Sequence, residues 1–205
     1  MSNDSERIAL CLQSPSVDLE ALASILDGLT LSARVSAVRS INGKAQARLW
    51  EASKGRGVTI DEIVPPELGP DVEVIYAGKN SLPMFTHFEK RFCRAFDAPG
   101  CLYGYNEGAV RPLIGPGYFV VRYFEDRSEA GVDYYQVPPD GASLPPNWPG
   151  IKANERGLQR FVYAKMVDYL RRVSNGVFIG RAVRKGKDTN NYFLLCRAHD
   201  VAALS

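Results

Sequence analysis

The sequence predicts an α+β fold in which N-terminal helices precede a mainly antiparallel β-sheet. One long helix, about residues 155–174, packs on this sheet, and a final β-hairpin completes it. Two observations predict this order: apolar residues recur with helical spacing near both ends of the chain, and β-prone runs separated by turn residues fill the middle. The chain of 205 residues, 45% of them hydrophobic, suits a single domain over 1–205 with a possible helical subregion at 1–60.

The N-terminal part is predicted to be helical. Residues 17–28 place their leucines on one face and end at Gly28, a common helix terminator. Residues 32–53 keep a helical rhythm that an Asn-Gly pair interrupts, so we expect a helix broken near Gly43. A loop rich in glycine and proline at 54–71 is the best internal boundary.

The next two elements are a short strand at 72–76 and a helix at 82–96. The helix is predicted from phenylalanines at helical spacing, which are Phe85, Phe88, Phe92 and Phe96. An aromatic stripe of this kind indicates core packing rather than a cofactor site.

The middle of the chain is rich in β-prone residues. Strands are predicted at 101–106, 118–124 and 132–137, with a Gly-Pro-Gly turn at 115–117. The segment 138–153 follows with five prolines and a tryptophan. Loops of this length are uncommon inside a compact domain unless they are functional or disordered.

The long helix at 155–174 is predicted from an apolar stripe bounded by Asn154 as N-cap and Gly176 as terminator. Strands at 177–184 and 191–197 then form the final hairpin.

The net charge of +2 conceals a basic region. Between residues 152 and 197 the chain has eleven Lys and Arg against three Asp and Glu, a net +8, which leaves −6 for the remainder. This asymmetry indicates either a basic face for an anionic partner or two halves that neutralise each other within one fold.

Composition also excludes several classes of protein. No apolar run is long enough to span a membrane, and the polar, acidic start differs from a secretory signal, so a cytoplasmic location is expected. Four cysteines without Cys-x-x-Cys spacing are predicted to be buried thiols. Two histidines, His87 and His199, are too few for a histidine-rich metal site, so no metal is expected.

The leading hypothesis is a small-molecule binding domain with the proline-rich segment as a lid. Its ligand would be anionic, aromatic or apolar. The candidate ligand-binding residues are Lys79, Tyr105, Arg111, Tyr118, Asp133, Tyr135 and Trp148. Arg111 or Lys79 would pair with an anionic group. Asp133 is either a cavity carboxylate or the partner of Arg122 in a cross-strand ion pair.

Two alternatives remain open. Nucleic acid or a protein partner could bind the basic C-terminal region through Arg181, Arg184, Lys185 and Lys187. An enzyme would use acid and base groups among Asp133, Tyr118, Lys79 and His87, although no phosphate loop, dinucleotide fingerprint or nucleophile elbow is present to name a reaction or a cofactor. Exposed sheet edges could also pair in a homodimer.

Overall fold

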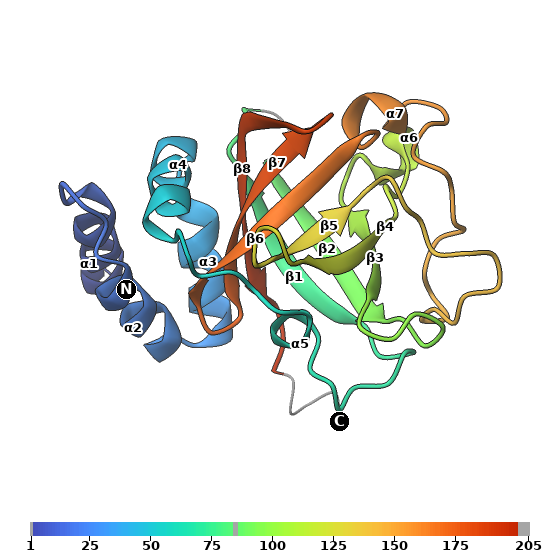
Figure 1. The fold of residues 1–205 in the computed structure, drawn as a ribbon. Helices are drawn as coiled ribbons and strands as arrows, with labels where there is room; N and C mark the ends of the chain where they lie inside the picture. Colours follow the sequence, from blue (N-terminus) through green and yellow to red (C-terminus); the bar gives the residue numbers. More distant parts are fainter. Residues whose placement is uncertain (1, 84–85, 201–205) are drawn as a thin grey trace.

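The computed structural model describes residues 2–83 and 86–200, and its main element is a closed antiparallel barrel of eight strands (Figure 1). Each strand pairs with the next along the chain, and the last pairs with the first. The strands are β1 (Val74–Asn80), β2 (His87–Arg94), β3 (Leu102–Glu107), β4 (Phe119–Phe124), β5 (Glu129–Asp133), β6 (Met166–Ser174), β7 (Val177–Arg184) and β8 (Lys187–Arg197). Every described strand has neighbours on both sides, so none offers the open sheet edge that edge-to-edge dimerisation needs.

The closed barrel shows that the predicted open sheet packed by a long helix is wrong. The segment 155–174 contains only the short helix α7 (Gln159–Val162), after which the chain continues as strand β6. Leu170 of β6 lies in the barrel core, whereas Tyr169 and Val173 pack outward against the N-terminal helices. Because both faces of β6 are covered, its apolar residues do not show the simple alternation that would mark a strand.

The predicted helix with the phenylalanine stripe is also wrong, because this segment forms strand β2. Phe88 and Phe92 point into the barrel core, Phe96 is exposed, and Phe85 lies outside the described residues. A spacing of four residues keeps side chains on one face in a strand as well as in a helix. The stripe therefore indicated a shared face for Phe88 and Phe92, but it was wrong about the type of element and about Phe96, which lies beyond the end of β2.

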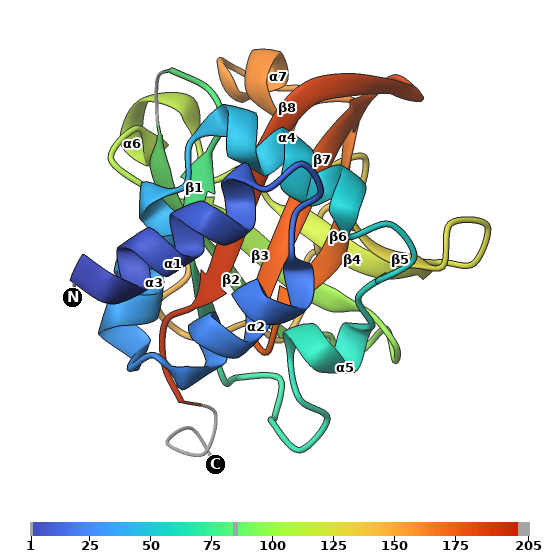
Figure 2. The same ribbon diagram turned by 90° about the vertical axis from the view of Figure 1, so that its left-hand side faces the viewer.

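The N-terminal helices cover the outer face of β6, β7 and β8, with α2, α3 and α4 against the strands and α1 packed on α2 and α4 (Figure 2). They are α1 (Ser2–Gln13), α2 (Leu19–Gly28), α3 (Leu31–Ser40) and α4 (Gly43–Ala52). The predicted helix break near Gly43 is confirmed, and the Asn42 side chain caps α4 by accepting a hydrogen bond from Ala45 N at 3.0 Å. None of the described helices combines the length and apolar character needed to cross a membrane.

The two ends of the barrel differ. Helix α5 (Ile60–Ile63) packs across one end, where Tyr76 OH donates a hydrogen bond to Ile63 O at 2.9 Å. Helix α6 (Arg111–Ile114) and helix α7 lie close together at the opposite end (Figure 1). The barrel is therefore filled by apolar side chains near α5, and its other end, which we call the mouth, holds the cavity described next.

Candidate functional site

A cavity of about 560 Å³ lies at the mouth of the barrel. The inner faces of β1, β2, β3, β6, β7 and β8 form its wall, and residues of α6 and α7 form part of its rim. This volume lies within the range of small-molecule sites, which are mostly apolar with a few polar groups that fix the ligand. The lining has this character, with Phe88, Ile114, Tyr163 and Met166 among its apolar members.

Four buried polar side chains meet in this cavity. Lys90 Nζ donates hydrogen bonds to Asn106 Oδ1 at 3.0 Å, to Asp168 Oδ2 at 3.2 Å and to Tyr134 OH. Lys90 is 2% exposed and Asp168 is 3% exposed. Lys90 and Asn106 are direct partners across β2 and β3, whereas Asp168 comes from β6. Closure of the barrel brings these groups together.

Aromatic rings surround the amine of Lys90. Its Nζ lies 5.0 Å from the ring centroids of Phe119 and Tyr134, 5.1 Å from that of Phe193 and 5.7 Å from that of Phe88. Rings at this distance attract a cation through their quadrupole, and the attraction grows when water is excluded. The ring faces thus compensate part of the cost of burying the lysine.

Burial brings the pKa values of Lys90 and Asp168 toward each other. Desolvation lowers the pKa of the Lys90 amine, an effect that the charge of Asp168 opposes. Desolvation raises the pKa of the Asp168 carboxyl, against the opposing effect of Lys90. Burial, followed by the charge of Asp168, raises the pKa of Tyr134 well above 10.0, so its hydroxyl stays protonated. An amine and a carboxyl tuned in this way can exchange a proton with a bound molecule, and such groups in cavities are typical of functional sites.

One oxygen of the Asp168 carboxyl makes no hydrogen bond with a described residue, although the nearby Tyr134 hydroxyl lowers the pKa of this carboxyl. Asp168 Oδ1 is buried and accepts no hydrogen bond from any described residue, although Oδ2 of the same carboxyl is bonded to Lys90. A buried acceptor in this condition costs about 1–3 kcal/mol, and more when it is charged. Because Asp168 lines the cavity, a hydroxyl or N–H group of a ligand would satisfy this oxygen.

Three of the seven sequence-predicted site residues cluster elsewhere, outside the barrel. The Tyr105 ring lies 5.0 Å from the Trp148 ring and 5.6 Å from the Tyr118 ring, between centroids. Trp148 Nε1 donates to Glu73 Oε1 at 2.6 Å, and Tyr118 OH donates to Pro149 O. The proline-rich segment therefore covers this cluster with Trp148, and it accepts the hydrogen bond of Tyr118. The Tyr105 hydroxyl donates to Glu107. None of the three aromatic residues lines the cavity at the mouth.

The other four predicted residues are dispersed. Asp133 Oδ2 pairs with Arg122 Nε at 3.2 Å, so the structure shows the cross-strand ion pair that was one of its two interpretations. Tyr135 is exposed, and Lys79 does not line the mouth cavity. Arg111 does line it, and its Nε donates to Glu107 Oε1 at 2.8 Å.

Sequence reasoning missed Lys90, Asn106, Tyr134 and Asp168 as site residues. A signal for two of them exists once the correct strands are known. In β2 the residues that face into the barrel are Phe88, Lys90 and Phe92. In β6 Asp168 and Leu170, two residues apart, face into the barrel in the same way. A charged residue at an inward position of a strand needs a partner or a function. Both segments were assigned to helices, which hid this alternation.

Within residues 2–83 and 86–200, no three or more His, Cys, Asp and Glu side chains are grouped so as to hold a metal ion. Cys93 and Cys196 are buried thiols, as predicted, and burial raises their pKa values to about 12 and about 11. Cys11 and Cys101 are only partly buried.

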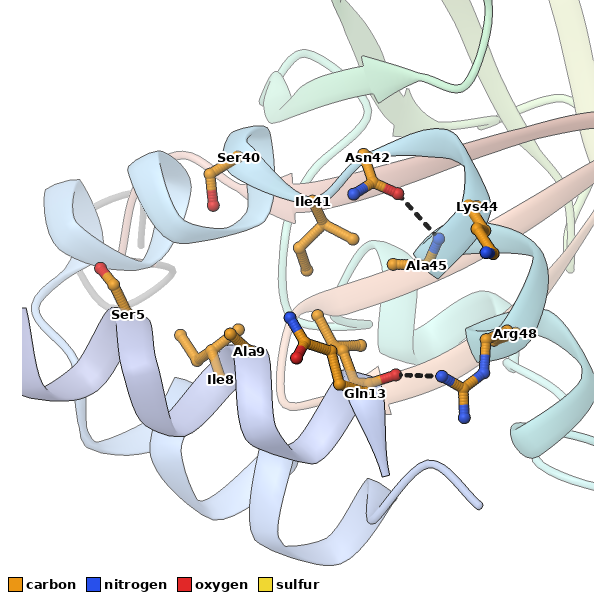
Figure 3. A pocket seen from close by; sticks show the side chains of 11 residues that line it. Ser5, Ile8, Ala9, Gln13, Ser40, Ile41, Asn42, Lys44, Ala45 and Arg48 are labelled. Atoms are coloured by element: carbon orange, nitrogen blue, oxygen red, sulfur yellow. Dashed lines mark hydrogen bonds between the residues drawn. The ribbon is translucent and has the colours of Figure 1, made fainter. Parts of the chain in front are cut away.

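A second hollow, of about 310 Å³, lies between α1 and the turn from α3 to α4 (Figure 3). Its main polar groups already bind the backbone. Arg48 Nη1 donates to Leu12 O at 2.7 Å, and Asn42 caps α4. No buried, unpartnered group with a perturbed pKa lines this hollow among the described residues, so the mouth cavity is the stronger candidate.

Comparisons with protein families, with curated proteins and with solved structures find no match for this chain.

Proposed function

We propose that this protein binds a small molecule in the mouth cavity, with an apolar body against the aromatic wall and one hydrogen-bond donor directed at Asp168. The unpartnered Asp168 Oδ1 carries the proposal, because it is a buried acceptor that lines a largely apolar cavity. Next to Asp168 Oδ1 the opposite charges of Lys90 and Asp168 cancel, which favours an uncharged donor such as a hydroxyl at this point. Elsewhere in the lining Arg111 pairs with Glu107, and Arg184 has no ion-pair partner among the described residues.

Native mass spectrometry of the purified protein, beside a denatured control, tests this proposal without a guess about the ligand. We expect a retained small molecule that disappears on denaturation. Stripped protein is then titrated with two matched probes, 2-naphthol and 2-methoxynaphthalene. The hydroxyl of 2-naphthol can donate to Asp168, and the methoxy group cannot, so we expect about tenfold tighter binding of 2-naphthol.

Two tryptophan variants locate the binding. Val162 lines the cavity, so Val162→Trp should obstruct the mouth and weaken probe binding. Leu113 is exposed on α6 without lining the cavity, so Leu113→Trp is the matched control and should bind as the wild type does. The proposed function would be contradicted if the native mass equalled that of the polypeptide alone and neither probe bound.

Catalysis of proton transfer on the bound molecule is a second candidate. It is favoured by the opposing pKa shifts of Lys90 and Asp168, which bring an acid and a base toward similar proton affinities inside the cavity. Once a retained ligand is identified, its incubation with the protein in D2O provides the test. Deuterium should enter the ligand at carbon only if this activity is present.

The alternative of nucleic-acid binding is weakened by the partners of two of its four residues. Arg181 pairs with Asp188 at 3.0 Å, and Arg184 donates to the backbone carbonyls of Phe161 and Val162. Lys185 and Lys187 are exposed and remain available to an anionic partner.

A further inference from the structure

Apolar side chains at the mouth of the barrel face the solvent. Leu158 is 50% exposed, Phe161 is 64% exposed, and Leu113 on the neighbouring helix α6 is 72% exposed. Phe161 and Val162 also line the cavity, so apolar surface continues from the cavity over its rim. Large apolar side chains gathered around an opening indicate a surface that contacts an apolar partner.

Basic side chains are interleaved with these apolar ones. We define the rim surface as Arg156, Leu158, Arg160, Phe161, Val162 and Lys165. Its three basic residues are exposed, and none has a carboxylate within ion-pair distance among residues 2–83 and 86–200. Glu155 is the only acidic residue between positions 155 and 165.

The turn between β7 and β8 extends the basic character of this surface. Lys185 N donates to Lys165 O at 2.8 Å, and Arg184 Nη1 donates to Phe161 O at 3.0 Å, so the turn is fixed beside α7. Part of the +8 region seen in the sequence is thereby placed at the barrel mouth. The guanidinium carbon of Arg160 lies 4.6 Å from the Phe161 ring centroid, so a cation and an apolar ring are neighbours at the barrel mouth.

We propose that the rim surface docks on an anionic lipid bilayer and that the barrel exchanges its ligand with that bilayer. This inference rests on the proposed function, because an apolar ligand partitions into membranes and a mouth that faces the bilayer shortens its path. Surfaces that combine Phe and Leu with Arg and Lys bind at the headgroup level, with about 1 kcal/mol per basic residue near anionic lipid. Nucleic acid would use the cations but not the exposed Leu158 and Val162.

Co-sedimentation with vesicles tests the docking. We expect the wild-type protein to bind phosphatidylcholine vesicles that contain phosphatidylglycerol, to bind pure phosphatidylcholine weakly, and to dissociate as salt rises to about 0.5 M. Phe161→Asp and Arg160→Glu should each weaken binding to the anionic vesicles about tenfold. Equal binding of these two variants and the wild type would overturn the proposal.

Two control variants show whether the effect belongs to the mouth. Phe96 is 74% exposed and follows β2 at the opposite end of the barrel, so Phe96→Asp should leave vesicle binding unchanged. Arg7 on α1 is also exposed, so Arg7→Glu is the control for charge. Melting curves by circular dichroism confirm that all four variants are folded. A loss of binding in the controls equal to that in the rim variants would contradict a local docking surface.

A second measurement separates this inference from the proposed function. Arg160 does not line the cavity, so Arg160→Glu should bind 2-naphthol in solution as the wild type does. Probe binding without vesicle binding would overturn the docking and leave the proposed function standing. Vesicle binding without any retained ligand or probe binding would contradict the proposed function and support a membrane surface alone. Binding of a double-stranded DNA probe that Arg160→Glu weakens, with no vesicle binding, would assign the surface to nucleic acid and overturn the proposal.

Discussion

Lys90 and Asp168 illustrate the cost of polar groups inside the barrel. Removing one member of a buried ion pair leaves the other uncompensated, so Lys90→Met and Asp168→Leu should each destabilise the protein by about 3–5 kcal/mol. The double variant replaces the pair with apolar side chains and should regain at least wild-type stability. Urea unfolding of the four proteins provides this double-mutant cycle.

The exposed pair Arg7 and Asp4, with Nη1 and Oδ1 at 3.4 Å, is the control. Its cycle should give a coupling energy of about 0–1 kcal/mol. If the double variant lost as much stability as the two single variants added together, the ion pair between Lys90 and Asp168 would be contradicted. Restored stability in the double variant would mean that the pair is not needed for folding, which is the expectation for residues kept to bind or transform a ligand.

His199 should make the free energy of unfolding fall as the pH is lowered. Its Nε2 accepts a hydrogen bond from Ile75 N at 3.4 Å, which only the neutral imidazole can do. Burial, then the charge of Arg197, lowers its pKa below 6.5, while Glu73 opposes the shift. The unfolded chain therefore takes up a proton first as the pH falls, and the stability present above about pH 6.5 decreases until the folded pKa is passed.

Comparison of the wild type with His199→Ala isolates the contribution of His199 to the free energy of unfolding, because the other titrating groups are common to both proteins. The difference in unfolding free energy between the two proteins should shrink as the pH is lowered from about 8 to about 5. The effect is small since the imidazole is only half buried. A difference that stays constant over this range would contradict the assignment.

At the scale of the element, local signals predicted α2, α3 and α4, did not indicate α1, and failed for two strands. The side chains of Thr30 and Asn42 cap α3 and α4 by accepting backbone hydrogen bonds, and such caps are encoded within a few residues. Strand β6 has no such marker. Leu170 faces the barrel core and Tyr169 faces the helices, so the strand is apolar on both sides because of elements far away in the sequence.

Glycines inside the strands make room for the rings that fill the barrel. A Cβ at Gly180 in β7 would lie 2.1 Å from the Cζ atom of Phe193, whose ring lies across the glycine backbone. Gly180→Ala should therefore destabilise the protein by about 1–3 kcal/mol, measured by urea unfolding. Adding Phe193→Leu should recover part of this loss. A methyl group at Gly28 would meet no atom within 4 Å, so Gly28→Ala is the control and should leave stability unchanged or slightly increased.

At the scale of the whole molecule, the candidate site depends on closure of the barrel. Lys90 and Asp168 are 78 residues apart in the sequence, and no local pattern indicates that they meet. Strands β1 and β8 pair over an even longer stretch of chain, as Tyr76 with Arg197, so the sequence suggested strands without showing that they close. The basic region was visible in the composition, but its place at the mouth follows only from the contacts of Arg184 and Lys185 with α7 and the start of β6.

The two tryptophans can test whether the chain unfolds as one domain, as the sequence predicts. Trp50 lies between α4 and the barrel, with its ring 6.5 Å from that of Tyr192, and Trp148 covers the outside of β3 and β4. Trp148→Phe and Trp50→Phe each leave one reporter. Because the helices share an apolar core with β6, β7 and β8, fluorescence and far-UV circular dichroism should give one common urea midpoint within each variant. An earlier transition at Trp50 alone would show that residues 1–60 form a separate subregion.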